Sequence, residues 1–189
     1  MDALELLTAD HNRVRGLFTR FQAAEGENDA QAARLAAKIF EELEVHTKIE
    51  EEIFYPAVTK LNEEIHELIT EGLEEHHVVD NVMAEVKALT PSDEEWAAKM
   101  KVLIENVEHH AEEEEKEMFP KARKAMDSDA RAELGQQLEA RKAALGAPTA
   151  ADKEHLSTEE LNRLAREQEI PGRSDMKREE LLATVAPES

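Results

Sequence analysis

Apolar residues recur every three or four positions along four long segments of the chain, which is the spacing of one helix face. These segments cover residues 2–24, 29–60, 62–89 and 93–126, and a weaker helical pattern follows over residues 128–145. Short turn-forming stretches such as EGEND and TPSD separate them, and strand signals are absent. The pattern predicts an all-α fold, an antiparallel up-down four-helix bundle.

Each of the four apolar stripes contains a histidine, and two stripes add a glutamate one turn later. A single histidine on such a stripe is usually a core residue hydrogen-bonded to a neighbour, and a single glutamate usually reaches water at the edge. Matching positions on every helix favour a shared polar site instead. The six candidate residues are His11, His46, Glu50, His76, His110 and Glu114.

An internal repeat supports the shared site. HTKIEEEIFYP at residues 46–56 and HAEEEEKEMFP at residues 110–120 both follow the pattern His-x3-Glu-x5-Pro, and DHNRVRGLF parallels EHHVVDNVM. The chain therefore contains two similar helical hairpins, whose pairing would bring all six candidates to one level of the bundle. Each proline is expected to kink or loosen the helix just beyond the site.

Composition limits the classes of function. The formal net charge of −21 argues against a chain-wide grip on nucleic acid or on an anionic membrane, and the absence of cysteine excludes thiolate chemistry. No apolar run approaches the ~18 residues that a membrane span needs. The first residues, MDALELLTADH, do not have the pattern of a signal peptide, so we expect a cytoplasmic protein.

The donor set indicates the kind of ligand. Two ionised carboxylates left unpaired in a core would cost several kcal/mol each, and metal cations would offset that cost. Four imidazoles with two carboxylates suit borderline divalent metals and are too many ligands for one tetrahedral zinc ion. Two ions that share two bridging glutamates use the set fully, with iron as the first choice and manganese or a mixed site still open. A ferritin-type centre is disfavoured because both Glu-x-x-His strings, ending at His66 and His77, lie on one helix and off its stripe.

The motifs DHNRVRGLF, LEVHTKIEEEIFYP, EEHHVVD and VEHHAEEEEKEMFP, in this order, make residues 1–145 resemble the hemerythrin-like family of HHE cation-binding domains. The resemblance implies a non-haem di-iron centre that binds dioxygen or related small molecules. It makes the four histidines terminal ligands and the two glutamates bridges. Binding, sensing and detoxification of dioxygen, peroxide or nitric oxide remain open, as do enzymatic turnover of peroxide or nitric oxide, metal storage, iron-responsive regulation and a metal-free structural bundle.

Several neighbours of the candidate ligands stay ambiguous in the sequence. Oxygen carriers of the family have a histidine where this chain has Asp80, which either ligates or leaves a position for water and disfavours simple oxygen transport. Glu51 and Glu115 would replace the bridging glutamates if the helices were rotated. Tyr55 could hydrogen-bond near the metals, although packing is the expected role. His77 and His109 are expected to be solvated or to support the ligands from outside.

A smaller segment follows the bundle. Residues 146–155 are expected to be a linker, and residues 156–189 a helix-loop-helix appendage that resembles the module at the N-terminus of the Rho termination factor. Such modules often touch nucleic acid, here through Arg173, Lys177 and Arg178. Residues 152–189 nevertheless carry ten acidic and six basic side chains, a net charge of −4. Contact with a protein partner, or stabilisation of the bundle, is therefore the favoured role.

Overall fold

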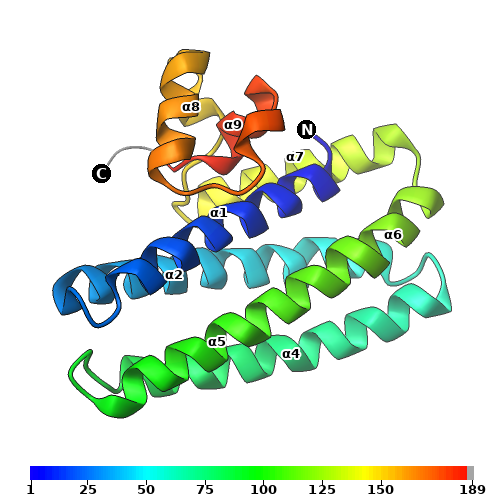
Figure 1. The fold of residues 1–189 in the computed structure, drawn as a ribbon. Helices are drawn as coiled ribbons and strands as arrows, with labels where there is room; N and C mark the ends of the chain where they lie inside the picture. Colours follow the sequence, from blue (N-terminus) through cyan, green and yellow to red (C-terminus); the bar gives the residue numbers. More distant parts are fainter. Residues whose placement is uncertain (187–189) are drawn as a thin grey trace.

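The computed structural model describes residues 1–186 and contains the predicted antiparallel four-helix bundle (Figure 1). Sequential helices pair closely, α1 with α2 and α4 with α5. Within the described residues the secondary structure is helical throughout, without strands, and no helix is long and apolar enough to cross a membrane. The bundle helices are α1 (Ala3–Ala24), α2 (Asp29–Ile49), α4 (Glu63–Lys87) and α5 (Glu94–Glu113).

The α2 and α5 helices each continue through one widened turn into a short helix. The π-helical turn η1 (Glu50–Phe54) leads into α3 (Tyr55–Val58), and η2 (Glu114–Met118) leads into α6 (Phe119–Ala125). The turns close with bonds from the Tyr55 and Phe119 amides to carbonyls five residues earlier. A proline follows in each case and lacks the N–H that a regular turn would use. The predicted loosening is thus a π-helical turn, and a candidate glutamate begins each one.

Two apolar clusters occupy the two ends of the bundle core, and the polar candidates lie between them. One cluster includes Phe18, Phe21 and Trp96, whose indole packs 5.5 Å from the Phe21 ring between centroids. The other includes Leu7 and Phe54 together with residues of α7 (Ser128–Ala144). Burial of these side chains stabilises the bundle on both sides of the polar layer. The layer is therefore sealed from water along the bundle axis.

The C-terminal segment packs on α1 as a small helical module with its own core (Figure 1). It consists of η3 (Ala151–Lys153), α8 (Thr158–Glu167), η4 (Arg173–Asp175) and α9 (Arg178–Thr184). The fit is close at Gly16, where a Cβ atom would lie 2.5 Å from the Gln168 carbonyl oxygen. Arg13 of α1 is buried and donates to the carbonyl oxygens of Ala183 and Thr184.

The cationic side chains of this module are largely used within it. Arg178 donates to the carbonyls of Leu156 and Glu154, and Arg173 donates to the carbonyl of Ile170. Lys177 is exposed and begins α9 with a hydrogen bond from its backbone amide to Glu180, which leaves its ammonium group at the surface. These internal bonds reduce the number of cations that could face a nucleic acid.

Candidate metal centre

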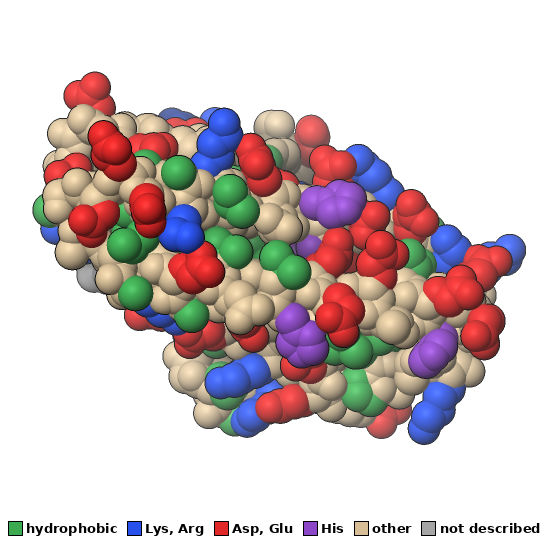
Figure 2. Space-filling model, turned by 90° about the horizontal axis from the view of Figure 1, so that it is seen from below, with side chains coloured by type: hydrophobic (Ala, Val, Ile, Leu, Met, Phe, Trp, Pro, Cys, Tyr) green, Lys and Arg blue, Asp and Glu red, His purple; other side chains and the backbone are tan. Residues whose placement is uncertain are grey.

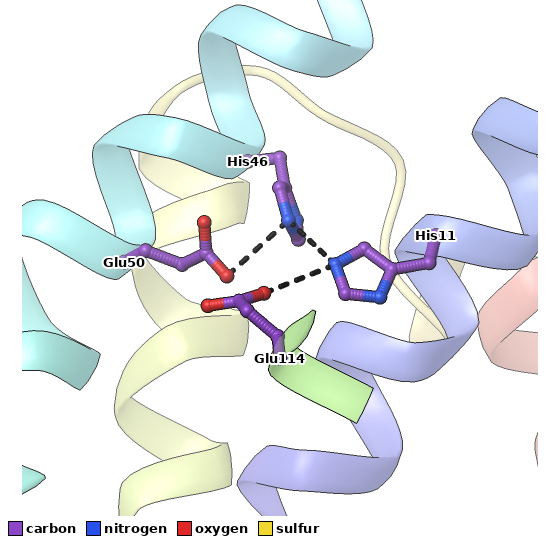
Figure 3. A group of neighbouring side chains, drawn as sticks. All are labelled: His11, His46, Glu50 and Glu114. Carbon is purple, nitrogen blue, oxygen red and sulfur yellow. Dashed lines mark hydrogen bonds and ion pairs between the residues drawn. The ribbon is translucent and has the colours of Figure 1, made fainter. Parts of the chain in front are cut away.

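The six candidate residues meet in the middle of the bundle. The histidines come from α1, α2, α4 and α5, one from each helix, and the glutamates from the first position of η1 and η2. All six are buried, with exposed fractions of 6% or less. Figure 3 shows His11, His46, Glu50 and Glu114 pointing toward a common centre from three different parts of the chain. The site therefore depends on the whole bundle.

The imidazoles face one another in two pairs through their Nε2 atoms. The Nε2 atoms of His11 and His46 are 3.1 Å apart, and those of His76 and His110 are also 3.1 Å apart. Two nitrogen ligands bonded at right angles to one metal ion, at about 2.1 Å each, would be about 3 Å apart. The spacing within each pair thus fits two histidines on one ion.

The glutamates lie between the two pairs. Glu50 Oε1 is 3.3 Å from His46 Nε2, and its Oε2 is 3.5 Å from His76 Nε2. Glu114 Oε2 is 3.3 Å from His11 Nε2 and 3.8 Å from His110 Nε2. Two groups of ligand atoms result, one of His11, His46, Glu50 and Glu114 and one of Glu50, His76 and His110. A carboxylate common to both groups is what a bridging ligand requires.

The buried carboxylates lack partners of the usual kind. Both oxygens of Glu50 and Oε2 of Glu114 are fully buried and have no hydrogen-bond partner among the described residues. A buried polar atom without a partner costs about 1–3 kcal/mol, and more when it is charged. Oxygens directed at neighbouring imidazole nitrogens fit a divalent cation well, because the cation would satisfy both kinds of atom. The donor set is that of a borderline transition metal.

A carboxylate also faces the outer nitrogen of every histidine. Nδ1 of His11 lies 2.8 Å from Glu115, Nδ1 of His76 lies 2.8 Å from Glu51, and Nδ1 of His110 lies 2.7 Å from Glu75. Asp10 is the corresponding carboxylate beside His46, with its Oδ2 atom 3.7 Å from Nδ1 of His46. A carboxylate at Nδ1 keeps the proton there and presents a basic Nε2 to a metal.

The structure decides the alternative that the sequence left open for Glu51 and Glu115. They were possible substitutes for the bridging glutamates, but they lie outside the centre and orient His76 and His11. Asp10 and Glu75 were missed because each precedes a candidate histidine and lies off the apolar stripe. The internal repeat could have revealed both residues, because the acidic residue before the histidine in DH at 10–11 recurs in EH at 75–76.

Burial and neighbouring charges shift the pKa values of the residues in the site. Burial, with the charge of Glu114, raises the pKa of Glu50 well above its usual range, whereas the histidines around Glu114 outweigh burial and lower its pKa. Burial alone would lower the pKa of His11, but Glu114 and Glu115 raise it to about 9. Burial lowers the pKa of His46 to about 4. Without metal, the imidazole of His11 is therefore protonated on both nitrogens at neutral pH.

Asp10 connects the centre to the rest of the molecule. Its carboxylate pairs with the buried Lys142 of α7 and with Arg13, whose Nη2 atom is 3.3 Å away. Burial would raise the pKa of Asp10, but Lys142, His46 and Arg13 lower it well below its usual range. Arg13 in turn binds the C-terminal module. A continuous chain of buried polar contacts thus runs from His46 to that module.

Tyr55 and Phe119 occupy equivalent positions in the two halves and break the symmetry of the site. The rings of His76 and Tyr55 stack at 5.6 Å, and those of His11 and Phe119 at 5.9 Å. The Tyr55 hydroxyl also donates to Glu114 Oε1 at 3.0 Å and lies 3.4 Å from His76 Nε2. Tyr55 therefore has a polar contact with the centre in addition to its packing role. Gly72 makes room for this hydroxyl, because a Cβ atom there would be 3.2 Å from it.

A cavity of about 20 Å³ adjoins the histidines. Most of its other lining is apolar, with Val14, Phe18 and Val79 among the side chains, and it is large enough for one water-sized molecule. Arg15 and Glu108 also line it and form an ion pair of 3.0 Å whose side chains are partly exposed. The cavity can therefore hold a small molecule beside the candidate ligands.

The remaining candidates lie on the surface. Asp80 is exposed and belongs to neither buried ligand group, so the structure does not place it as a ligand. His66 and His77 are exposed as well, in agreement with their positions off the stripe. His109 is exposed and faces Glu75 and Glu113.

Fold and site together define a four-helix bundle with a candidate cation site of histidines and glutamates in its core. The hemerythrin HHE cation binding domain matches residues 2–122, so the chain belongs to that family. A DNA nickase from Nostoc sp. is 30% identical over 132 residues, which are 68% of this chain and 36% of the nickase. The chain thus spans about a third of that relative's length.

A solved structure extends the comparison to the fold of nearly the whole chain. It is the crystal structure of a hemerythrin HHE cation binding domain-containing protein from Mycobacterium kansasii, described as an Rv2633c homolog. The TM-score is 0.65 at 22% sequence identity, and the match covers 98% of this chain and 99% of the other. At this identity the likeness concerns the fold, and its coverage takes in the C-terminal module.

Proposed function

We propose that the chain holds two iron ions at its four histidines and two glutamates, and that it binds or transforms dioxygen, peroxide or nitric oxide there. The observation that carries this proposal is the presence of three buried, unpartnered oxygens, both of Glu50 and Oε2 of Glu114, among four imidazole nitrogens. Iron suits imidazole and carboxylate ligands together. A bound iron pair would supply electrons and open coordination positions for a small ligand.

The chain's own residues favour a small and largely apolar ligand. The cavity beside the histidines admits about one water-sized molecule, and Val14, Phe18 and Val79 give it an apolar lining. Tyr55 can donate a hydrogen bond near the centre, because burial, together with Glu114 and Glu50, raises the pKa of its hydroxyl well above the usual range. The O–H proton is therefore retained at neutral pH.

The test is to load the full chain with ferrous iron without oxygen and then add dioxygen, hydrogen peroxide or nitric oxide in separate samples. We expect new visible absorption with at least one of the three, and Tyr55→Phe should retain iron while the spectrum or the decay of the product changes. This substitution removes only the hydroxyl and leaves all four histidines and both glutamates in place. Unchanged iron content is therefore the internal control. An iron-loaded chain that responds to none of the three molecules would contradict the proposal.

A second candidate function is iron-responsive regulation through the C-terminal module. The contacts from His46 through Asp10 and Arg13 to the carbonyls of Ala183 and Thr184 favour this function. Metal binding that orders His46 would also stabilise the docking of the C-terminal module through them. Hydrogen exchange of the α9 amides in the full chain tests this idea. Iron loading should slow their exchange, and identical exchange with and without iron would remove this candidate.

A further inference from the structure

A third group of potential metal ligands lies on the surface above the buried centre. It consists of Glu75 on α4 with His109 and Glu113 on α5, whose ligand atoms all lie within 4.8 Å of one another. His109 Nε2 is 3.6 Å from Glu75 Oε1 and 3.5 Å from Glu113 Oε1. These distances are too long for good hydrogen bonds. They are close to the about 3.4 Å that separates donor atoms bonded to one tetrahedral ion at 2.0–2.1 Å.

Glu75 connects this surface group directly to the buried centre. One of its oxygens faces His109, and the other accepts from Nδ1 of His110 at 2.7 Å. The side chain of Glu75 is 20% exposed, that of Glu113 is 32% exposed and that of His109 is 65% exposed. Exposure thus decreases from His109 through Glu75 to the buried His110. A cation at the surface group would share Glu75 with a candidate ligand of the inner centre.

The two halves of the bundle differ in how they neutralise the equivalent carboxylate. Asp10, which corresponds to Glu75 in the repeat, pairs with Lys142 and Arg13 and is covered by the rest of the chain. In the described part of the chain, the ion pairs of Glu75 are with His109 and His110. Glu71 and Glu117 add negative charge around Glu113. Where one half of the bundle supplies lysine and arginine, the other presents an acidic site with one imidazole.

The surroundings of the group attract cations. Figure 2 shows the molecule from the side of α4 and α5, where exposed imidazoles lie among many acidic side chains. A concentration of negative charge raises the local concentration of divalent cations and the rate at which they arrive. Imidazole adds selectivity for borderline metals over calcium and magnesium.

We propose that Glu75, His109 and Glu113 form a surface site for a borderline divalent cation, such as ferrous iron or cobalt, through which metal reaches His110 and the buried centre. The loading role rests on the proposed function, because it requires the buried centre to take up metal. The binding role is independent of it. A cation held at this site is already on the short path to His110, since Glu75 contacts both histidines.

The test uses His109→Ala and Glu113→Gln in the full chain, which leave Glu75 in contact with His110. His77→Ala is the matched control, because His77 is similarly exposed at 67% and faces one carboxylate, that of Glu74, at 3.7 Å. Cobalt binding at equilibrium gives the number of ions, and stopped-flow absorption during anaerobic loading with ferrous iron or cobalt gives the rate.

We expect the unmodified chain and His77→Ala to bind one weakly held cobalt ion more than His109→Ala or Glu113→Gln. Filling of the buried centre should slow in these two variants by on the order of tenfold, without change in its final metal content. An equal number of cobalt ions in all four proteins, or equal loading rates, would overturn the proposal. If the buried centre stayed empty in every protein, both the proposed function and the loading role would fail. The surface site would still be tested, because the unmodified chain and His77→Ala should bind one weakly held ion more than His109→Ala and Glu113→Gln.

Discussion

At the scale of single residues, the carboxylates behind the histidines determine how well the site can hold a metal. Glu115 is the clearest example, because it faces Nδ1 of His11 and is itself held by Arg15 at 2.8 Å. This arrangement fixes the imidazole ring and the position of its proton. It makes Nε2 the nitrogen that faces the centre.

Glu115→Gln should therefore weaken metal binding by about 10–100-fold while leaving the fold intact. The amide can still contact His11 but no longer carries the charge that makes the imidazole basic. Competition for cobalt against a chelator measures the affinity. Glu112→Gln is the control, because Glu112 is exposed and pairs with Lys116 on the helix surface. Equal affinities for the two variants would show that Glu115 does not support the site.

Metal affinity should rise with pH. In the metal-free chain, His11 has a pKa of about 9 and is therefore protonated at neutral pH, and burial with the charge of Glu114 raises the pKa of Glu50 well above its usual range. A metal must displace the proton from His11, and this displacement becomes easier as pH rises toward 9. Chelator competition at pH 6.5, 7.5 and 8.5 should show increasing affinity at each step. An affinity that stayed constant between pH 7.5 and 8.5 would contradict the assignment of His11, since ordinary histidines are already deprotonated there.

The limit of prediction from sequence is clear at this scale. The histidines and the two glutamates could be predicted because each interrupts an apolar stripe, where a polar side chain needs an explanation. Asp10 and Glu75 could not, because an acidic residue beside the stripe looks the same whether it faces water or Nδ1 of a histidine. The alternative in which Glu51 replaces Glu50 stayed open in the sequence for the same reason. Only the packing of neighbouring helices decides which carboxylates turn inward.

At the scale of elements, the widened turns η1 and η2 place the two glutamates. In each turn, the backbone carbonyl of the glutamate accepts a hydrogen bond from the amide of the residue five positions later. The proline that follows lacks the N–H that a regular turn would use. The sequence predicted a disturbance at both prolines because their chemistry requires one. Its form as a π-helical turn depends on tertiary packing, which the pattern alone does not specify.

Pro120→Ala should stabilise the metal-free chain and weaken its metal binding. Alanine restores an N–H and lets the turn tighten, so we expect a gain on the order of 1 kcal/mol, less than the about 3 kcal/mol that proline costs inside a regular helix. The tighter turn would move Glu114 relative to the histidines. Thermal unfolding without metal and cobalt affinity are the two measurements.

The control for this substitution is Pro91→Ala, in the loop between α4 and α5. It should leave cobalt affinity unchanged. If Pro120→Ala also bound cobalt as tightly as the unmodified chain, the widened turn would have no role in placing Glu114.

At the scale of the whole molecule, the C-terminal segment packs tightly on the bundle. The sequence indicates two short helices here, and the structure confirms a capping box of Ser157 and Glu160 at the start of α8, whereas α9 begins after Lys177 and not after Ser174, the residue that the sequence suggested as its cap. The place where they dock was not predictable, because it depends on a glycine in α1 and a buried arginine whose partners are backbone carbonyls. Gly16 and Arg13 carry no sequence signal for a contact more than 150 residues away.

Gly16→Ala should loosen this docking even though alanine favours a helix by about 1 kcal/mol over glycine. The new Cβ atom would lie 2.5 Å from the Gln168 carbonyl oxygen, so the module must shift. Limited proteolysis should cut residues 146–156 faster in this variant than in the unmodified chain. Thr19→Ala, at an exposed position of the same helix, should be cut at the unmodified rate. Equal cutting of both variants would mean that the contact at Gly16 does not hold the module.

The central claim is that four histidines and two glutamates hold two iron ions, and metal content tests it most directly. The full chain, loaded anaerobically with ferrous iron and freed of excess metal, should contain about two ions. Glu50→Ala should fall below one ion, because Glu50 belongs to both ligand groups. His66→Ala, which removes an exposed histidine, should still contain two. An unmodified chain that retained only a small fraction of one ion would contradict the account. Equal losses of metal in Glu50→Ala and His66→Ala would contradict it as well.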